Sequence, residues 1–275
     1  MTGGNDLTFR RVVVALDAAT DCAAAIEMAA SVAAGWGASL RAMFVEDEEL
    51  VRLAALPFAQ QIDPVTALRS RLDAAALQSG FAAQAQQMRR DLQAIADRHA
   101  LPWSFQVTRA AIGAGALCLA EDDLVVVAVT TRPIASRVHL ESPWRRVLGQ
   151  VRHSLLLVPE RPSAAGPVAV FYEETQAGRR ALDASRRIAR AGKRALLVVV
   201  REDTPPALQA EIEASIRAEG SHVTLRTLSA VSKQDLHEFI AASHATLLVV
   251  GRDGSADMAI TDLLPLSPTG AMLVL

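Results

Sequence analysis

The chain has 275 residues, enough for about two domains, and 51% of them are apolar, enough for substantial cores. Its formal net charge of -2 argues against a nucleic-acid-binding protein, which would usually present a strongly basic face. No apolar stretch reaches the roughly 20 residues that cross a bilayer, and the opening residues MTGGNDLTFRR lack the apolar segment of a signal peptide. We therefore expect a cytoplasmic protein that binds neither nucleic acid nor a membrane.

Each half of the chain contains five short apolar runs separated by helical patterns. Runs such as VVVAL and LVVVAV are apolar throughout rather than alternating, which is typical of parallel strands covered on both faces. Between the first two runs, small and apolar residues recur at helical spacing, as in Ala25, Ile26, Ala29, Ala30 and Ala33. In chain order we predict strands near residues 10–16, 39–45, 103–109, 124–129 and 154–158, and again near 167–172, 195–200, 222–228, 246–250 and 271–275.

The two halves are related in sequence. The segment from residue 159 to 167 is rich in Pro, Ala, Ser and Gly, as linkers are. A shift of 156 positions aligns the text on its two sides over some 35 residues without a gap, and it places Asp17 on Glu173. Duplication explains this alignment better than chance does. It predicts one domain at residues 1–160 and a shorter one at residues 166–275.

The alternation of strand and helix predicts an α/β fold with right-handed crossovers. Each half is then an open, doubly wound parallel sheet of the flavodoxin or Rossmann type, with strand order 3-2-1-4-5. Such sheets bind ligands outside the carboxyl ends of their strands. Any binding site should therefore follow the first and fourth strands of each half. The last strands, at residues 155–158 and 272–275, are expected at sheet edges, where exposed apolar strands invite pairing.

Few residues suit metal or catalytic chemistry. Cys22 and Cys118 lie in alanine-rich helical patterns without a CxxC spacing, so we expect buried thiols that pack as small apolar side chains. His237 and His244 lie seven residues apart without acidic or sulfur partners at ligand spacing, which argues against a metal site. No G-x-S-x-G, H-E-x-x-H or P-loop motif occurs. The sequence thus predicts no enzyme.

The order of these motifs resembles that of the universal stress proteins, and the chain resembles a tandem member with two such domains. The resemblance rests on VVVALDAATDCAAAIEMAASVAAGWGASL, on FVEDEE, and on DLVVVAV followed by a loop, a helix and LLLVP. It implies a pseudo-two-fold arrangement in which the last strands of the two halves pair antiparallel within one chain. It also implies a role in the stress response, and it raises the question of adenine-nucleotide binding.

The first half lacks the glycines that nucleotide-binding members carry. Their loop after the fourth strand reads G-x2-G-x9-G-[ST], and here those places hold Ala128, Thr131, Glu141 and Ser142. Glycine there allows positive φ and brings N–H groups close to phosphate oxygens, but Thr131 is β-branched and Glu141 adds negative charge. Ser142 suits either a phosphate ligand or a helix N-cap, and Asp17 suits either a ligand or a structural cap. We predict that this half does not bind nucleotide.

The second half restores part of that motif, because Gly251 and Gly254 follow its fourth strand as G-x2-G. One interpretation is a site for ATP or AMP, in which Glu173 takes the place of Asp17, Arg252 supplies positive charge and Ser267 replaces the final hydroxyl of the motif. The other is that the glycine pair is only a turn, since the third glycine is absent and the connection to the last strand is short.

An extra stretch of roughly 30 residues separates the second and third strands of the first half. Leu50, Leu53, Leu56 and Phe58 form an apolar stripe on a short helix that ends at Pro57. This stripe is either a lid over the domain's own cleft, a surface for a partner or a second copy, or a cover for a pocket that the altered loop leaves empty. A further helix is predicted near residues 81–100.

These observations predict a non-catalytic sensor or adaptor. In a first hypothesis the C-terminal half binds an adenine nucleotide, and its occupancy changes how the chain meets a protein partner. In a second, neither half binds nucleotide and the chain acts through protein contacts alone. A weak nucleotide-hydrolysing enzyme is a third. The sequence identifies neither the partner nor the oligomer, and a homodimer is compatible with each hypothesis.

Overall fold

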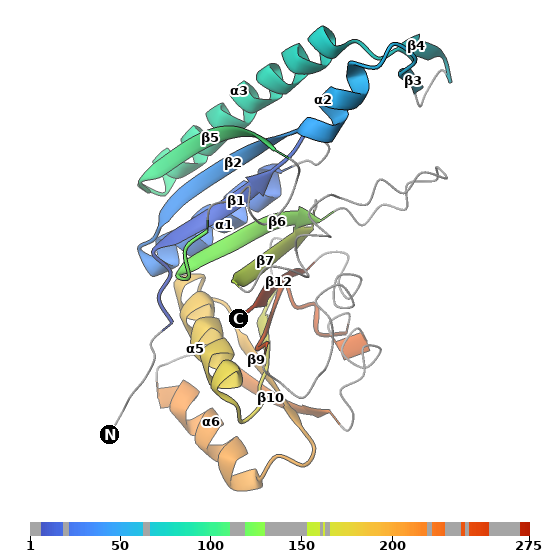
Figure 1. Ribbon diagram of the computed structural model, residues 1–275. Coiled ribbons are helices and arrows are strands. Elements are labelled where there is room, and N and C mark those ends of the chain that lie inside the picture. The colour runs from blue at the N-terminus through green and yellow to red at the C-terminus, as the bar shows by residue number, and fades with distance from the viewer. Residues whose placement is uncertain are drawn as a thin grey trace.

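The computed structural model describes residues 7–18, 22–62, 67–110, 119–129, 153–159, 162, 166–218, 222–228, 238–239, 242–252 and 270–275. Ten strands in these residues form one continuous sheet (Figure 1). Those of the first half are β1 (Arg11–Leu16), β2 (Ser39–Asp47), β5 (Trp103–Ala110), β6 (Asp123–Val129) and β7 (Ser154–Pro159). Those of the second half are β8 (Val168–Phe171), β9 (Leu196–Arg201), β10 (Val223–Leu228), β11 (Leu247–Val250) and β12 (Ala271–Val274).

Across the sheet the strand order is β10-β9-β8-β11-β12-β7-β6-β1-β2-β5. Numbered in chain order within each half, both sets of five strands follow 3-2-1-4-5, which confirms the predicted fold class. The register also confirms the shift of 156 positions, because Val12 pairs with Leu40 and its counterpart Val168 pairs with Leu196. The domain limits stay a prediction, because residues 160, 161 and 163–165 lie outside the described part of the chain.

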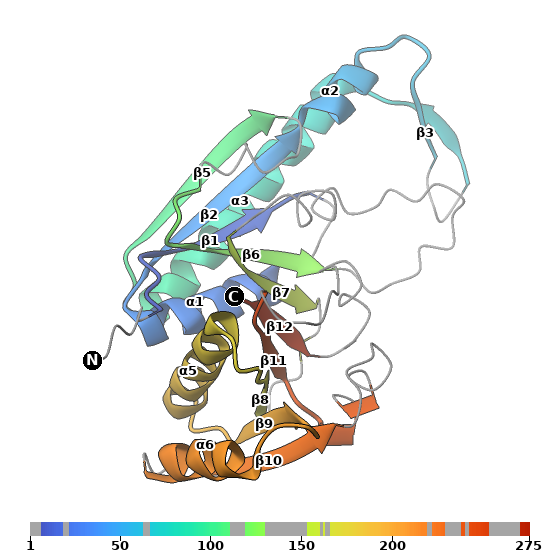
Figure 2. The ribbon, with the colours of Figure 1, turned by 60° about the horizontal axis from the view of Figure 1, so that its bottom comes forward.

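The two halves are joined at their last strands. β7 and β12 pair antiparallel, with Leu156 opposite Leu273, whereas the other pairs of this sheet are parallel. Figure 2 shows β7 and β12 side by side in the middle of the sheet. This pairing confirms the predicted joining of the halves, and it covers two apolar edges that would otherwise be exposed.

Helices of both halves pack on the same face of the sheet. α1 (Ala23–Trp36) and α3 (Ala74–Arg98) share one apolar core with Val12 and Val14, and α5 (Gln176–Ala191) and α6 (Pro206–Ala218) extend it over the second half. Cys22 is buried in this core, while Cys118 lies outside the described residues. Among the described residues no helix is both long and apolar enough to cross a membrane.

A second contact joins the halves through α1 and α5. Nε of Arg187 donates a hydrogen bond to the carbonyl oxygen of Gly35 at 2.9 Å, and its guanidinium lies 5.1 Å from the centre of the Trp36 ring. α1 and α5 also lie close at Gly35, where an added Cβ would make an ordinary van der Waals contact of 4.0 Å with the Cβ of Ala191. The two halves therefore meet through side chains as well as through the sheet.

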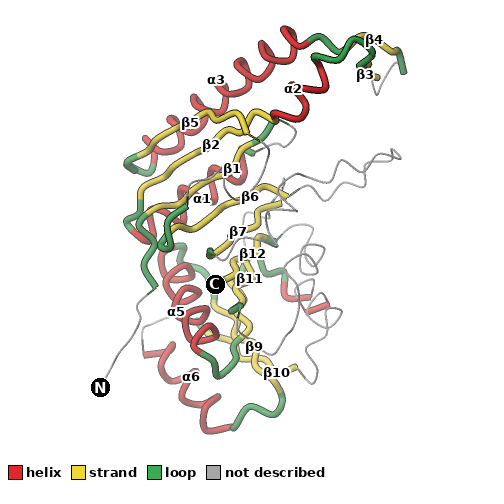
Figure 3. Tube along the Cα trace, viewed as in Figure 1, coloured by secondary structure: helices red, strands yellow, loops and turns green. Residues whose placement is uncertain are grey.

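The extra stretch of the first half forms α2 (Glu48–Ala54) and a small hairpin of β3 (Gln60–Ile62) and β4 (Arg69–Arg71), seen beside the outer end of α3 in Figure 3. α3 begins at Ala74, well before the predicted start near residue 81, because the Asp73 side chain caps it by accepting from the N–H of Ala75 at 2.9 Å. The hairpin was not predicted. Leu50 packs against the core, but Leu53, Leu56 and Phe58 are exposed, so most of the stripe does not pack as a lid.

Candidate functional site

Parallel pairing gathers the predicted site residues at one edge of the sheet. β1 lies beside β6 with Ala15 opposite Val127, so Asp17 and Ala128 end up on neighbouring strand ends. In the second half β8 lies beside β11, which brings Glu173 and Gly251 to the equivalent place. The remaining predicted residues, Thr131, Ser142, Gly254 and Ser267, lie outside the described part of the chain.

In the first half this edge is closed by the chain itself. Asp17 is only 4% exposed. The side-chain amide of Gln84, in α3, donates to the carbonyl oxygen of Ala18 at 3.1 Å and so ties the loop after β1 to that helix. Phe81 of α3 packs against Phe44 of β2 with ring centres 6.4 Å apart. α3 follows the extra stretch directly, so the longer connection brings this cover.

The neighbouring strand ends of the first half carry carboxylates with structural partners. Glu46, near the end of β2, forms an ion pair with Arg109 of β5 at 2.9 Å. Asp47 caps α2 and accepts hydrogen bonds from the N–H groups of Glu49 and Leu50 at 2.9 and 3.4 Å. A negatively charged helix cap is favourable at a helix N-terminus. The carboxylates of Glu46 and Asp47 therefore have structural roles, and they would repel an anionic ligand.

In the second half the same edge is more open. Glu173, two residues beyond β8, is partly exposed, in contrast to Asp17. Arg201 ends β9, and its guanidinium donates two hydrogen bonds of 3.1 Å to the carboxylate of Asp203. Asp203 raises the pKa of Arg201, and the negative charge of Glu173 adds to this effect. A carboxylate and a guanidinium thus lie at adjacent strand ends, and the sequence analysis had not singled out Arg201.

Two glycines let the backbone approach closely beside Glu173. A Cβ on Gly178, in the first turn of α5, would lie 2.0 Å from the carbonyl oxygen of Glu173. One on Gly251 would lie 2.7 Å from the carbonyl carbon of Ala177. Gly178 went unnoticed in the sequence, although a glycine just inside a helix start is a usable signal of close approach. Gly251 therefore has a steric role, whatever else it contacts.

Tyr172 and Arg179 lie next to this edge. Burial raises the pKa of Tyr172, and Arg179, which hydrogen-bonds to its side chain, partly opposes the shift. Thr175 caps α5 by accepting from the N–H of Gly178 at 3.0 Å. The first turn of α5 is thus held by the Thr175 cap, by the close contact of Gly178 with Glu173, and by the hydrogen bond between Tyr172 and Arg179.

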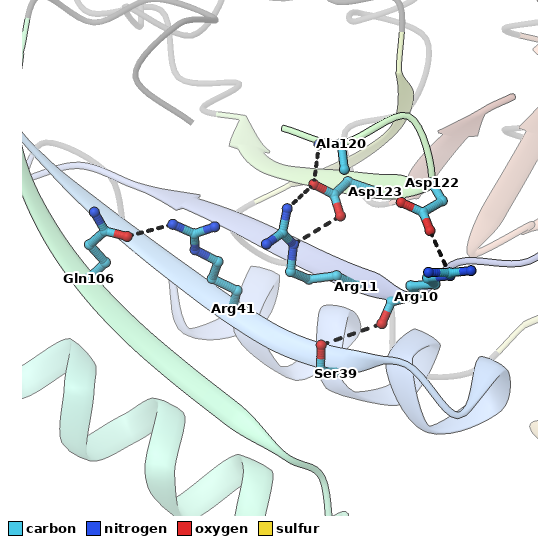
Figure 4. A network of polar contacts seen from close by, with 8 residues as sticks. All are labelled: Arg10, Arg11, Ser39, Arg41, Gln106, Ala120, Asp122 and Asp123. Atoms are coloured by element: carbon cyan, nitrogen blue, oxygen red, sulfur yellow. Dashed lines mark hydrogen bonds and ion pairs between the residues drawn. The ribbon is translucent and has the colours of Figure 1, made fainter. Parts of the chain in front are cut away.

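A polar network lies at the opposite ends of the strands, their amino ends (Figure 4). Arg11 donates through Nε to Asp123 at 2.9 Å and through a second nitrogen to its other oxygen, and Asp123 also accepts from the N–H of Ala120 at 2.7 Å. Arg10 pairs with Asp122 at 3.0 Å. These groups lie at the amino ends of β1 and β6, away from the candidate site, and their role is to hold the strand register.

No protein-family model matches the sequence, and no curated protein matches it. Solved structures do. A universal stress protein from Archaeoglobus fulgidus DSM 4304 aligns over 98% of this chain and 97% of its own, with a TM-score of 0.62 and 13% identity. A putative universal stress protein from Pseudomonas aeruginosa UCBPP-PA14 aligns over 97% and 93%, with a TM-score of 0.51 and 16% identity.

The fold is that of the universal stress proteins. Both alignments run through the two halves, so the predicted tandem arrangement is shared with these structures. Another universal stress protein from Archaeoglobus fulgidus was solved in complex with dAMP, and it matches 41% of this chain with a TM-score of 0.33 and 20% identity. That ligand is a property of that protein, and a match at this level carries no argument for the present one.

Arg252 follows β11 at the carboxyl end of the strand, and its described contacts are internal. Its backbone N–H donates to the carbonyl oxygen of Leu275 at 2.7 Å, which continues the ladder between β11 and β12. Its guanidinium donates to the carbonyl oxygen of His153 at 2.7 Å, just before β7. Arg252 therefore links the second half to the first.

Proposed function

We propose that this chain is a tandem universal-stress-type protein that acts in the cytoplasm as a non-catalytic sensor or adaptor. Its C-terminal half binds one adenine nucleotide, ATP or AMP, and its N-terminal half binds none. The observation that carries this proposal is the difference between two equivalent carboxylates. Asp17 is 4% exposed, whereas Glu173 is partly exposed at the same place in the second sheet.

The N-terminal half is unsuited to a nucleotide for two reasons. The loop after β1 is held by Gln84 of α3, so a base entering there would first have to break that hydrogen bond. In addition, Ala128 stands where the second half has Gly251, and the sequence has Glu141 in the place of the third glycine of the family motif, which adds a negative charge. Steric cover and charge oppose binding together.

The C-terminal half has the chemistry that an adenine nucleotide needs. A carboxylate such as Glu173 accepts hydrogen bonds from an amino group or from ribose hydroxyls, and Arg201 supplies positive charge at the next strand end. The sequence adds Gly254, whose backbone N–H would suit a phosphate oxygen, and Ser267, whose hydroxyl would replace that of the family motif. Arg252 contributes mainly by linking the end of β11 to the first half.

A second candidate function is an adaptor that needs no nucleotide. Two contacts favour it: Gly251 is explained by its approach to Ala177, and Arg252 is engaged by His153 and Leu275. On this hypothesis Gly251 serves the packing of β11 against α5, and Arg252 links the second half to the first.

Isothermal titration with ATP and AMP separates the two candidates. We expect one nucleotide per wild-type chain, and we expect Glu173→Gln to weaken binding by about 10-fold or more, since a hydrogen bond to a charged group is lost. Asp17→Asn is the matched control and should leave the affinity unchanged. Absence of heat at millimolar nucleotide would leave the nucleotide-independent adaptor, and two nucleotides per chain would contradict the assignment to one half.

The same samples test the absence of catalysis. Incubation with ATP should release no phosphate above the rate of the buffer alone. Release that Glu173→Gln abolishes would establish the hydrolase that the proposal excludes.

A further inference from the structure

Exposed apolar side chains concentrate in one part of the molecule. We call residues 48–62 and 67–73, which contain α2, β3 and β4, the arm. Figure 1 shows it at the outer end of α3, away from the strands that join the halves. Among the described residues, one exposed large apolar side chain lies outside the arm: Val107, which is 46% exposed. Those within the arm are Leu53 at 48%, Leu56 at 39%, Phe58 at 75%, Ile62 at 60% and Leu68 at 69%.

The hairpin of the arm has little support from the rest of the described chain. β3 and β4 have three residues each and are paired only with one another in a separate sheet. A lone two-stranded hairpin is marginally stable in water, and it needs a third strand or an apolar face packed against a partner. An apolar patch of this kind on a surface commonly marks an interaction site. The arm therefore needs something to cover it.

The charges of the arm indicate what covers it. Arg69 and Arg71 lie on β4 at its outer end, are exposed, and form no ion pair with the described residues. Glu49, at the start of α2 where the arm leaves the sheet, is also exposed and also lacks an ion-pair partner there. The arm thus has two arginines towards its tip, with the nearby Asp73 capping α3, an exposed carboxylate at its base, and apolar side chains between them.

We propose that the arm is a dimerisation surface and that its occupant is the arm of a second copy of this chain. A two-fold axis brings the same patch of each protomer together, so contacts are reciprocal. If the arms run antiparallel, the tip of each meets the base of the other, which places Arg69 and Arg71 near Glu49 of the second protomer. Phe58, Ile62 and Leu68 are then buried between the arms. The pattern is self-complementary in charge and in apolar area.

Antiparallel strand pairing is compatible with the same arrangement. Two hairpins of β3 and β4 placed side by side would give four strands. The molecule already uses antiparallel edge pairing where β7 meets β12. This inference does not depend on nucleotide binding by either half.

The first test is the mass of the full chain in solution, measured by sedimentation equilibrium. The wild type should be a dimer at about 50 µM, and the double variant Phe58→Ser/Ile62→Ser should dissociate at least about 30-fold more readily, because it removes two apolar anchors. Val107→Ser is the matched control, an exposed apolar residue on β5, and it should remain dimeric. Far-UV circular dichroism should be the same for all three proteins.

Two results would overturn the proposal. A monomeric wild type would mean that the arm serves another occupant, such as a different protein. A double variant that dimerises as strongly as the wild type, with its circular dichroism unchanged, would place the dimer contact elsewhere.

The second test uses charge. Glu49→Arg alone, or Arg69→Glu/Arg71→Glu alone, should weaken the dimer by about 5-fold or more, since each creates like charges at the contact. The triple variant Glu49→Arg/Arg69→Glu/Arg71→Glu reverses both ends and should restore dimerisation to within about 3-fold of the wild type. If the triple variant is weaker than either partial variant, the antiparallel arrangement is wrong.

Discussion

The two halves of this protein share a sheet topology and differ in how they use it. Both have strand order 3-2-1-4-5, and their first strands pair in equivalent register. In the first half, however, Leu40 pairs with Trp103, 63 positions later, whereas in the second Leu196 pairs with Val223, 27 positions later. The longer connection contains the arm and the 25 residues of α3, whereas in the described residues the shorter one contains α6 alone, with 13 residues. A duplicated backbone has thus gained a covered edge and an exposed arm in one copy.

Equivalent positions also carry different chemistry. Asp123 of β6 binds Arg11 with two hydrogen bonds, while its counterpart Thr246 donates to the carbonyl oxygen of Gly166 at 3.3 Å. Gly178, the counterpart of Cys22, presses against Glu173. The sheet therefore determines which positions are neighbours, and the two halves place different residues at equivalent positions. Substituting such residues in each half measures how much their contributions to stability differ.

The largest effect is expected at Gly178. Replacing glycine by alanine inside a helix normally stabilises a protein by about 0.5–1 kcal/mol. Gly178→Ala should instead destabilise the chain by about 3 kcal/mol, because the new Cβ would lie 2.0 Å from the carbonyl oxygen of Glu173 and the first turn of α5 must move. Urea unfolding followed by circular dichroism measures this.

Two controls accompany that variant. Gly80→Ala makes the same change within α3, where an added Cβ has open space, and it should stabilise the chain slightly. Cys22→Ala, at the equivalent place in the first half, should cost about 1 kcal/mol for the lost thiol. If Gly178→Ala proves as harmless as Gly80→Ala, the close contact with Glu173 is not as the structure has it.

A smaller effect is expected where Asp123 meets Arg11. The Asp123 side chain is 1% exposed and that of Arg11 is 28% exposed. Arg11→Met would leave a buried carboxylate without its guanidinium, which should cost about 3 kcal/mol or slightly less. Thr246→Val, which removes the corresponding hydroxyl in the second half, should cost about 1 kcal/mol. Equal costs in urea unfolding would show that the two sites have not diverged in strength.

Much of the fold could be predicted from the sequence because buried parallel strands leave continuous apolar runs. The ten predicted strands match the observed ones within two residues at either end, and the apolar character of the last strand in each half pointed to β7 pairing with β12. The hairpin of β3 and β4 escaped prediction because strands of three polar or mixed residues leave no periodicity.

Only part of the candidate site could be predicted from the sequence. Asp17, Glu173 and Gly251 follow apolar runs, and parallel topology alone places them at strand ends. The partnership of Arg252 with His153 was not foreseeable, because it depends on how the halves dock across 99 positions of sequence. The burial of Asp17 was hidden for the same reason, since α3 reaches the loop after β1 through a hydrogen bond spanning 66 positions.

The smallest effect concerns pH and again separates the halves. Tyr172, the only tyrosine of the chain, has its pKa raised by burial, and its counterpart in the first half is Leu16. Below about pH 10 the phenol is protonated in the folded and unfolded states alike, so it confers no pH dependence. Above that pH the unfolded chain loses the proton first, so stability falls as pH rises towards the folded pKa. Wild type should therefore lose more stability than Tyr172→Phe between pH 9 and 11, by about 1 kcal/mol or less, and phenolate absorbance of the folded protein should rise above pH 10. An equal loss in both proteins would mean that the Tyr172 hydroxyl titrates as it does in water.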